Sequence, residues 1–261
     1  GVLFRGGEEG TIRKNLIDHN NIDAIIGLPA NIFFGTGIPT IIMVLRKNKK
    51  DSDVLIIDAS KGFEKDGKNN KLRACDIKRI VDAYKERPEK IEKFARRVSR
   101  AEIIQNDYNL NIPRYVDSSE KAESWDIYAS MFGGIPEAEL QDLSAYWTAF
   151  PHLKAALFSP DNEAYCRLNV ANLKNAVLSH PDVVAFKTAF QNAFGDFDAY
   201  LKSALIDGMT QLNAAGEEER LSREIFARLA GIPLVDRYAA YQLLDDDWKK
   251  IAIDLEIIQT E

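Results

Sequence analysis

Two adjacent aromatic residues, Phe33 and Phe34, stand in a segment whose other residues are typical of a loop. Pro29 precedes them, and the run GTGIP at residues 35–39 follows them. Loops are ordinarily polar, because water must satisfy their backbone. Two aromatic side chains at this place therefore need either a local packing partner or a ligand.

A second group of candidate residues lies in the segment NDYNLNIPRYVD at residues 106–117. Asn109, Asn111 and Tyr115 carry side chains that can hydrogen-bond to bases or phosphates, and Arg114 could contact a phosphate. Pro113 favours an extended conformation for the residues before it. The alternative is a structural strap in which the asparagine side chains satisfy the local backbone. Both readings stay open at this stage.

The elements that position the aromatic pair are three β-rich runs, DAIIGL at 23–28, PTIIMVLR at 39–46 and DVLIIDA at 53–59. The first two runs are nearly continuous in apolar residues, as expected for strands that are covered on both faces. The polar residues 48–51 predict an antiparallel hairpin that joins the second strand to the third. The aromatic pair would then lie in the loop between the first two strands.

Three segments, in this order, closely resemble the modification (M) subunit of type I restriction-modification systems. They are GVLFRGGEEGTIRKNLI at 1–17, DAIIGLPANIFFGTGIPTIIMVL at 23–45 and NDYNLNIPRYVD at 106–117. The resemblance implies site-specific adenine-N6 methylation of double-stranded DNA with S-adenosylmethionine in the intact subunit. It also implies a complex of two M subunits with one specificity (S) subunit, together with a restriction (R) subunit.

The resemblance gives the aromatic pair a role, because an enzyme that modifies a base must take it out of the duplex and stack it on an aromatic face. It implies that Phe33 or Phe34 supplies this face, with a slight preference for Phe34. Gly35, Thr36 and Pro39 would shape the pocket for the target base. The alternative is that both phenylalanines belong to the core.

Two motifs of the family are absent from the sequence. We find neither the Gly-rich turn that binds S-adenosylmethionine nor the catalytic Asn-Pro-Pro-aromatic motif, and the chain opens in mid-motif at Gly1. We therefore expect a C-terminal fragment that contains no catalytic residue, binds no S-adenosylmethionine and is inactive by itself.

Charge is distributed unevenly over a chain whose net charge is −6. Residues 1–117 carry +5 and residues 118–261 carry −11, while residues 46–100 form a basic belt of +8. Such a belt faces either phosphate, an acidic partner or simply solvent. Cys75 and Cys166 lack metal-type spacing, as do the isolated histidines, and no apolar run is long enough to span a bilayer. These features predict a reduced, cytoplasmic protein without a metal, and the resemblance implies that it comes from a bacterium or archaeon.

The predicted organisation has three parts. Residues 1–60 form the end of an α/β methyltransferase domain, with the last strands of a Rossmann-like sheet. Residues 61–117 form a basic helical and extended connector that starts with a charged loop at 61–75. Residues 118–261 form a mostly α-helical domain, in which we see no strand signal after residue 136. Prolines that can start helices recur there, at Pro136, Pro151, Pro181 and Pro233.

The final helix, residues 241–258, carries an apolar seam with alternating spacings of three and four. Its members are Tyr241, Leu244, Trp248, Ile251, Leu255 and Ile258. The seam either docks onto the S subunit or packs within its own domain. A competing function for the whole chain is a non-catalytic helical scaffold, and an Asn-Pro-Pro-aromatic motif directly upstream in the reading frame would decide against it.

Overall fold

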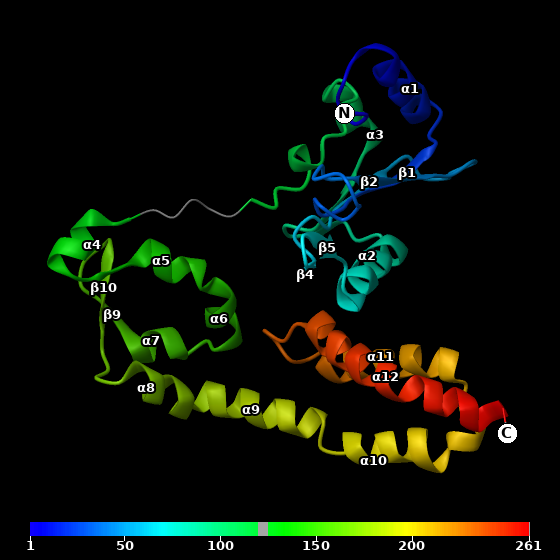
Figure 1. Cartoon of the computed structure of the whole chain (residues 1–261). Helices are drawn as coiled ribbons and strands as arrows, with labels where there is room; N and C mark the ends of the chain where they lie inside the picture. The colour runs from blue at the N-terminus through cyan, green and yellow to red at the C-terminus, as the bar shows by residue number, and fades with distance from the viewer. Residues whose placement is uncertain (120–124, 261) are drawn as a thin grey trace. The chain divides into compact units, whose positions relative to one another are not determined.

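The computed structural model describes residues 1–119 and 125–260 (Figure 1). The chain forms two compact units, residues 1–121 and 122–261, which we call the N-terminal and C-terminal units. The division between them falls in the segment 120–124, close to the predicted start of the helical domain at residue 118, and this segment lies outside the described residues.

The N-terminal unit is an α/β fold. Its elements are α1 (Gly7–Asp18), β1 (Ile22–Gly27), β2 (Ile41–Leu45), β3 (Val54–Asp58), β4 (Glu64–Asp66), β5 (Asn69–Lys71), α2 (Ala74–Glu86), β6 (Lys90–Ile91), β7 (Ala95–Val98), α3 (Arg100–Gln105) and η1 (Ile112–Arg114). The fold class predicted from the sequence, an α/β part followed by a mostly helical part, is confirmed.

One mixed sheet has the strand order β2-β1-β3-β7-β6. β1 is parallel to β3 and antiparallel to β2, and β7 is antiparallel to both β3 and β6. The three predicted strands are present, but the predicted hairpin between β2 and β3 is wrong. β1, buried along its whole length, lies between them, so residues 46–53 instead cross the amino end of β1.

Two further differences concern the edges of this sheet. β2 is an edge strand whose residues are exposed or half-buried, although its apolar sequence predicted cover on both faces. Residues 61–117, predicted as a connector, supply β6 and β7 to the same sheet. The short sequence ARRV of β7 buries Ala95 and Val98 at its ends and gives no alternating pattern that would mark it as a strand.

Apolar side chains cover both faces of the sheet. On one face, Ile25 and Ile56 pack with Ile17 of α1, Ile103 of α3 and Leu110. On the other face, Ala24, Ile26, Leu55 and Ile57 pack with Ile80 and Ala83 of α2. Alternate residues of β1 and β3 therefore pack against opposite layers of the fold. Because the two strands are parallel, both end at the same edge of the sheet.

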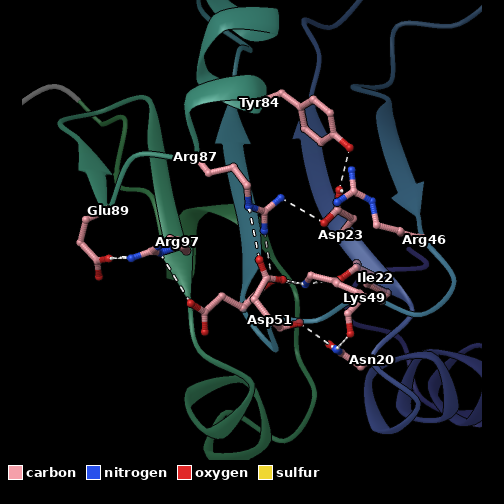
Figure 2. Close-up of polar contacts among 11 residues, drawn as sticks. Asn20, Ile22, Asp23, Arg46, Lys49, Asp51, Tyr84, Arg87, Glu89 and Arg97 are labelled. Atoms are coloured by element: carbon pink, nitrogen blue, oxygen red, sulfur yellow. Dashed lines mark hydrogen bonds and ion pairs between the residues drawn. The ribbon is translucent and has the colours of Figure 1, made fainter.

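A polar network holds the amino end of β1 (Figure 2). The fully buried Asp23 carboxylate accepts hydrogen bonds from Tyr84 Oη at 2.6 Å and from Arg87 at 3.0 Å. Both partners come from the end of α2, where Arg87 caps the helix with a left-handed φ of 47°. The carboxylate raises the pKa of the Tyr84 hydroxyl, because the hydroxyl donates to a negative charge. This network ties α2 to β1.

The crossing segment 46–53 is fastened to the same end of the sheet. The Lys49 ammonium donates to the carbonyls of Ile22 and Asp53, and Asn20 donates through its side chain to the carbonyls of Lys49 and Asp51. Burial lowers the pKa of Lys49, because desolvation penalises its charged form. Polar contacts therefore fasten the segments at the amino ends of β1 and β3. The loops that follow these two strands lie at the opposite, carboxyl end.

The C-terminal unit is mostly helical. Its elements are α4 (Ile127–Phe132), β8 (Ile135–Pro136), α5 (Glu137–Asp142), α6 (Ser144–Ala149), α7 (Leu153–Leu157), β9 (Phe158–Pro160), β10 (Tyr165–Leu168), α8 (Leu173–Ser179), α9 (Pro181–Ala193), α10 (Phe197–Lys202), η2 (Ser203–Asp207), η3 (Met209–Gln211), α11 (Ala214–Leu229) and α12 (Arg237–Thr260).

Strands in this unit correct the expectation that the region lacks them. β8, β10 and β9 form a small antiparallel sheet in that order. Each strand has four residues or fewer, which is too short for a periodic signal in the sequence. Of the four prolines predicted to start helices, Pro181 occupies the first position of α9, while Pro136 lies in β8 just before α5.

The predicted seam of α12 packs mainly within its own unit. Trp248 and Leu255 are buried with Leu221 of α11 and with Leu212, and Leu244 lies partly buried beside them. The Tyr241 hydroxyl donates to Glu218 of α11 at 2.9 Å. This corrects the prediction of Trp248 and Leu255 as partner contacts, because both are buried within the unit, whereas Tyr241 and Leu244 are half-buried. Only Ile251 and Ile258 of the seam are exposed, by 38% and 40%.

Candidate functional site

The predicted aromatic pair lies in the loop of residues 28–40, which joins the carboxyl end of β1 to β2. Phe34 is 92% exposed, Phe33 is 56% exposed and the nearby Ile38 is 71% exposed. The alternative in which both rings belong to the core is therefore wrong. The preference for Phe34 as the free face agrees with its greater exposure. Gly35 and Pro39 are exposed beside the rings, and Thr36 is half-buried.

The loop is anchored at its base although its tip is exposed. The backbone of Leu28 donates to the Thr40 carbonyl at 2.9 Å and closes the neck of the loop. The Thr36 hydroxyl accepts from the backbone N–H of Ile38 at 3.2 Å, and Gly35 takes a φ of +79° that a side chain would strain. Exposed rings on an anchored backbone form a surface on which a flat ligand could stack.

The anchor on the other side of this loop is Asn70, which the sequence analysis missed. Its side-chain amide donates to the Ala30 carbonyl at 2.7 Å, and its backbone N–H donates to the Asn31 carbonyl at 2.8 Å. Asn70 belongs to β5, in a hairpin that we had predicted as a plain loop. The Asp66-Gly67 pair is a recognised hairpin signal, and it could have revealed this turn.

Two buried polar atoms at this loop have no hydrogen-bond partner among the described residues. They are Asn70 Oδ1 and Thr40 Oγ1. Buried polar groups are nearly always paired, so such atoms mark places where ordered water or another group would complete the structure. Both belong to residues that fasten the loop rather than to its exposed tip.

Next to this loop, β3 ends at Asp58, whose carboxylate is buried. It accepts from the backbone N–H of Ser60 at 3.0 Å and from the Ser118 hydroxyl at 2.5 Å. A cleft of about 460 Å³ opens beside it, lined in part by the basic side chains of Lys61, Arg73, Arg79 and Lys93. Asp76 pairs with Arg73 at 2.9 Å in this cleft and raises the pKa of its guanidinium.

The second predicted group is a strap that packs on the core. Leu110 and Ile112 are buried between α1 and the sheet, and the backbone of Leu110 donates to the Leu3 carbonyl at 2.8 Å. Tyr115 is also buried, and its hydroxyl donates to the Asn109 carbonyl at 2.5 Å. The prediction that Tyr115 contacts DNA disagrees with this burial, because only 6% of the residue is exposed.

The remaining members of this group have local roles. The Asn109 side chain accepts from the backbone N–H of Asn111 at 2.9 Å, as in the structural alternative. Arg114 is exposed and donates to the Asn106 side chain at 3.2 Å. A single turn of 3-10 helix, η1, replaces part of the expected extended segment. Asn111 and Arg114 are the two members that are exposed to solvent.

S-adenosylmethionine is implied by the resemblance, but the described residues do not fit it. The glycine that ends β1, Gly27, is required for packing, since a Cβ there would lie 2.7 Å from the Ile112 side chain. The acid that ends β3, Asp58, already has both carboxylate oxygens in hydrogen bonds. Neither strand end therefore offers the open Gly-rich turn or the free acid that a nucleoside would need.

Two searches bear on other kinds of site. Among residues 1–119 and 125–260, no group of three or more His, Cys, Asp or Glu side chains is arranged to hold a metal ion. Within the same residues, no helix combines the length and the apolar character that crossing a membrane requires. Cys75 and Cys166 are both buried and free.

Comparison with known proteins shows where this fold belongs. The sequence profile of the N-6 DNA methylase family matches residues 1–124. Residues 1–124 are therefore similar to this family, and the match covers a little less than half of the chain. The resemblance predicted from the sequence is thereby confirmed. The matched segment covers the N-terminal unit, which we now call the methylase unit, and leaves nearly all of the C-terminal unit outside the match.

Curated relatives include the type I restriction enzyme MpnII methylase subunit of Mycoplasma pneumoniae, which is 42% identical over 128 residues. The type I restriction enzyme MjaVII methylase subunit of Methanocaldococcus jannaschii is 44% identical over 133 residues. Both matches cover 49% of this chain but only 23% of the relative. The matched part of the chain therefore spans less than a quarter of each relative's length.

Among solved structures, the methyltransferase subunit of a type I restriction-modification system from Streptococcus thermophilus is 55% identical. That match covers 46% of this chain and 25% of the other chain, with a TM-score of 0.44.

Proposed function

We propose that this chain is the C-terminal part of the M subunit of a type I restriction-modification system, in which the 28–40 loop holds the target adenine. The intact subunit would methylate adenine at N6 in double-stranded DNA with S-adenosylmethionine, in the cytoplasm of a bacterium or archaeon. The match of residues 1–124 to the N-6 DNA methylase family supports the reaction class. The single observation that carries the role of the loop is the 92% exposure of Phe34.

The chemical argument rests on the loop geometry. An adenine taken out of the duplex needs an aromatic face that is free in the unbound protein and held at a fixed place. Phe34 is free, and the hydrogen bonds of Leu28 and Asn70 fix the base of its loop. Phe33, at 56% exposure, would border the same pocket, with Gly35, Thr36 and Pro39 completing its wall.

The test compares Phe34→Ala with wild type in a methylation-competent M subunit that contains this chain. Loss of one stacked base should lower methylation by about 5- to 150-fold, corresponding to about 1–3 kcal/mol. Binding of the duplex should fall much less, because phosphate contacts supply most of the affinity. Filter-binding and methyl-transfer assays on the same protein measure both quantities.

Ile12→Ala is the matched control, since Ile12 is an apolar residue of α1 that is 61% exposed. It should leave methylation unchanged. Unchanged methylation by Phe34→Ala, or an equal loss of methylation, binding and melting temperature, would contradict the proposed role of the ring.

We propose further that the chain alone binds no S-adenosylmethionine and transfers no methyl group. The occupied Asp58 carboxylate and the packed Gly27 support this view. Isothermal calorimetry of the 261-residue chain with the cofactor tests it, and micromolar binding would contradict it.

For the C-terminal unit, we propose contact with the S subunit, within a complex that also holds a second M subunit and an R subunit. The burial of Trp248 and Leu255 leaves the exposed residues of α12 for this role. Ile253 and Ile257 are exposed by 67% and 53%, and the seam residues Ile251 and Ile258 by 38% and 40%. Ile253→Asp should weaken capture of the S subunit in a pull-down without lowering the melting temperature, and intact capture would contradict the proposal.

A scaffold function without chemistry is the second candidate for this unit. The observation that favours it is the position of residues 125–261 outside the methylase family match. Both candidate functions give the C-terminal unit a role in binding a partner. They differ for the methylase unit, where loss of methylation by Phe34→Ala would exclude a pure scaffold.

A further inference from the structure

The β4–β5 hairpin stands beside the 28–40 loop at the carboxyl end of β1. Its two strands pair in the register Glu64 with Lys71 and Asp66 with Asn69, joined by a two-residue turn. Gly67 has a φ of +59° in this turn, a value that tight hairpin turns need and that glycine adopts without strain. The two hydrogen bonds from Asn70 to Ala30 and Asn31 fasten the hairpin to the loop of Phe34.

The hairpin and the three residues before it, 61–63, expose four lysines against two acids. The lysines are Lys61, Lys65, Lys68 and Lys71, and all four are exposed. Lys71 lies 4.0 Å from Glu64, whereas Lys65 lies over the Phe63 ring with its ammonium 5.5 Å from the ring centre. Within the described residues, Lys61 and Lys68 form no ion pair, so their charges face solvent.

Much of the remaining basic belt at 46–100 is neutralised by the fold. Arg87 pairs with Asp23 at 3.0 Å, Arg96 with Glu102 at 2.8 Å and Lys78 with Asp82 at 2.7 Å. Lys61 is different, because it also lines the 460 Å³ cleft together with Lys93. The exposed positive charge near the Phe34 loop is therefore concentrated on the hairpin and at its base.

We propose that the β4–β5 hairpin is an arm that binds the phosphate backbone of duplex DNA beside the extruded base. The inference rests on the proposed function, because it takes the Phe34 loop as the place of that base. Taking a base out of a duplex requires that the flanking backbone be held, and contacts to phosphate set this register. Lysines on a two-stranded ribbon can supply such contacts without reading the sequence of the bases.

The experiment measures binding of the 261-residue chain to a fluorescein-labelled 20-base-pair duplex by anisotropy, at several KCl concentrations. The slope of log K against log salt is negative, and each lost phosphate contact reduces its magnitude by about 0.9. The triple variant Lys61→Ala, Lys65→Ala, Lys68→Ala should therefore reduce the magnitude of this slope by about 2 to 3. It should also weaken binding at least tenfold at low salt.

A matched control removes the same charge from the opposite end of the methylase unit. Lys47→Ala, Lys50→Ala, Lys85→Ala changes three exposed lysines, of which Lys47 and Lys50 lie between β2 and β3 and Lys85 lies at the end of α2. This variant should bind the duplex within about twofold of wild type, apart from a small general charge effect. A specific effect of the hairpin variant would support the arm.

Three outcomes would overturn the arm. They are equal losses in the two triple variants, no loss in the hairpin variant, and no measurable duplex binding by the wild-type chain at 50 mM KCl. The second outcome would redirect the hairpin lysines to an acidic protein surface. Failure here is distinguishable from failure of the proposed function, because the Phe34→Ala test measures methylation and does not depend on the lysines.

Discussion

The two units differ in how far along the chain their stabilising contacts reach. In the methylase unit, Arg13 of α1 donates to the Tyr108 carbonyl, 95 positions away, and Tyr84 donates to Asp23, 61 positions away. In the C-terminal unit, Tyr165 reaches Asp126 across 39 positions and Arg228 reaches the Ala193 carbonyl across 35. The first unit closes through distant segments, whereas the second is assembled largely from near neighbours in the sequence.

The cores show the same contrast. The methylase unit has one cluster on each face of its sheet, and both clusters are built on alternate residues of the same two strands, β1 and β3. The C-terminal unit also has two clusters, one around Phe150 and Val183 and one around Leu221 and Trp248, but they share no helix or strand. Clusters that share their strands should respond to a mutation together, whereas separate local clusters should respond one at a time.

Trp248→Ala gives the largest expected effect and tests the local character of the C-terminal unit. Truncation of this buried ring should cost about 3–5 kcal/mol, since it removes a large side chain from a packed cluster. Hydrogen exchange should rise in α11 and α12 and much less in α7 and α9. A circular-dichroism melt and exchange mass spectrometry on one sample measure both.

Ile253→Ala is the control for this prediction, because it is a residue of the same helix that is 67% exposed. It should cost no more than about 0.5 kcal/mol. Exchange that rises equally in α9 and α12 after Trp248→Ala would show that the two clusters unfold together. It would contradict the local character of the C-terminal unit.

Asp23→Asn tests the distributed character of the methylase unit. It keeps the shape of the side chain but leaves the Arg87 guanidinium, which is 19% exposed, without its carboxylate. The expected loss is about 2–3 kcal/mol, the range for hydrogen bonds to charged groups. Protection should fall together in β1, β3 and the end of α2, measured by hydrogen exchange.

Arg46→Ala provides the matched comparison at the same carboxylate. Arg46 lies 3.7 Å from Asp23 and its side chain is 56% exposed, so its removal should cost about 0 to 1 kcal/mol. An Asp23→Asn variant as stable as Arg46→Ala would mean that the network does not hold α2 to the sheet.

The same contrast explains what the sequence could predict. Apolar runs identified β1, β2 and β3, and the spacing of Trp248, Leu244 and Leu255 identified one face of α12, because both signals are local. The position of β1 between β2 and β3 could not be predicted, since it depends on pairing between segments that are separated along the chain. For the same reason, the sequence could not tell which helix packs against the seam of α12.

The candidate site divides in a similar way. Phe33 and Phe34 could be found because adjacent aromatics are unusual in a loop. Tyr115 was misplaced because its ring is buried only through contacts with α1 and the sheet. Asn70 was missed because nothing in its own sequence neighbourhood shows that it bonds to Ala30, which lies 40 positions away, and to the residue after it.

Asn70→Ala tests whether this contact between distant segments holds the 28–40 loop. It removes the side-chain bond to the Ala30 carbonyl and keeps the backbone bond to Asn31. The loss of stability should be about 1 kcal/mol, as for a single neutral hydrogen bond. Hydrogen exchange at residues 33–38 should become faster while β3 keeps its protection. Unchanged exchange in the loop would show that the Asn70 side chain does not hold it.

The smallest expected effect concerns pH and a contact between helices of the C-terminal unit. Asp182, near the start of α9, accepts from the His152 backbone N–H at 2.9 Å and lies 3.2 Å from His152 Nδ1. The backbone hydrogen bond is the main reason that the pKa of Asp182 lies below its ordinary value, and the neighbouring His180 adds to it. Because the folded-state pKa is lowered, the carboxylate stabilises the fold above the unfolded pKa, and this stability is lost as pH falls through the folded pKa.

Asp182→Asn isolates this contribution, because the amide keeps the shape and cannot ionise. The melting temperature of wild type should exceed that of the variant at pH 5, and the gap should narrow as pH falls through the folded-state pKa of Asp182, because the carboxyl then becomes protonated in both states. Asp198→Asn, an exposed acid in the first turn of α10, should show no such gap. A constant gap from pH 5 to pH 2.5 would mean that Asp182 acts through its shape alone, and that the junction of α7 and α9 depends on packing rather than on charge.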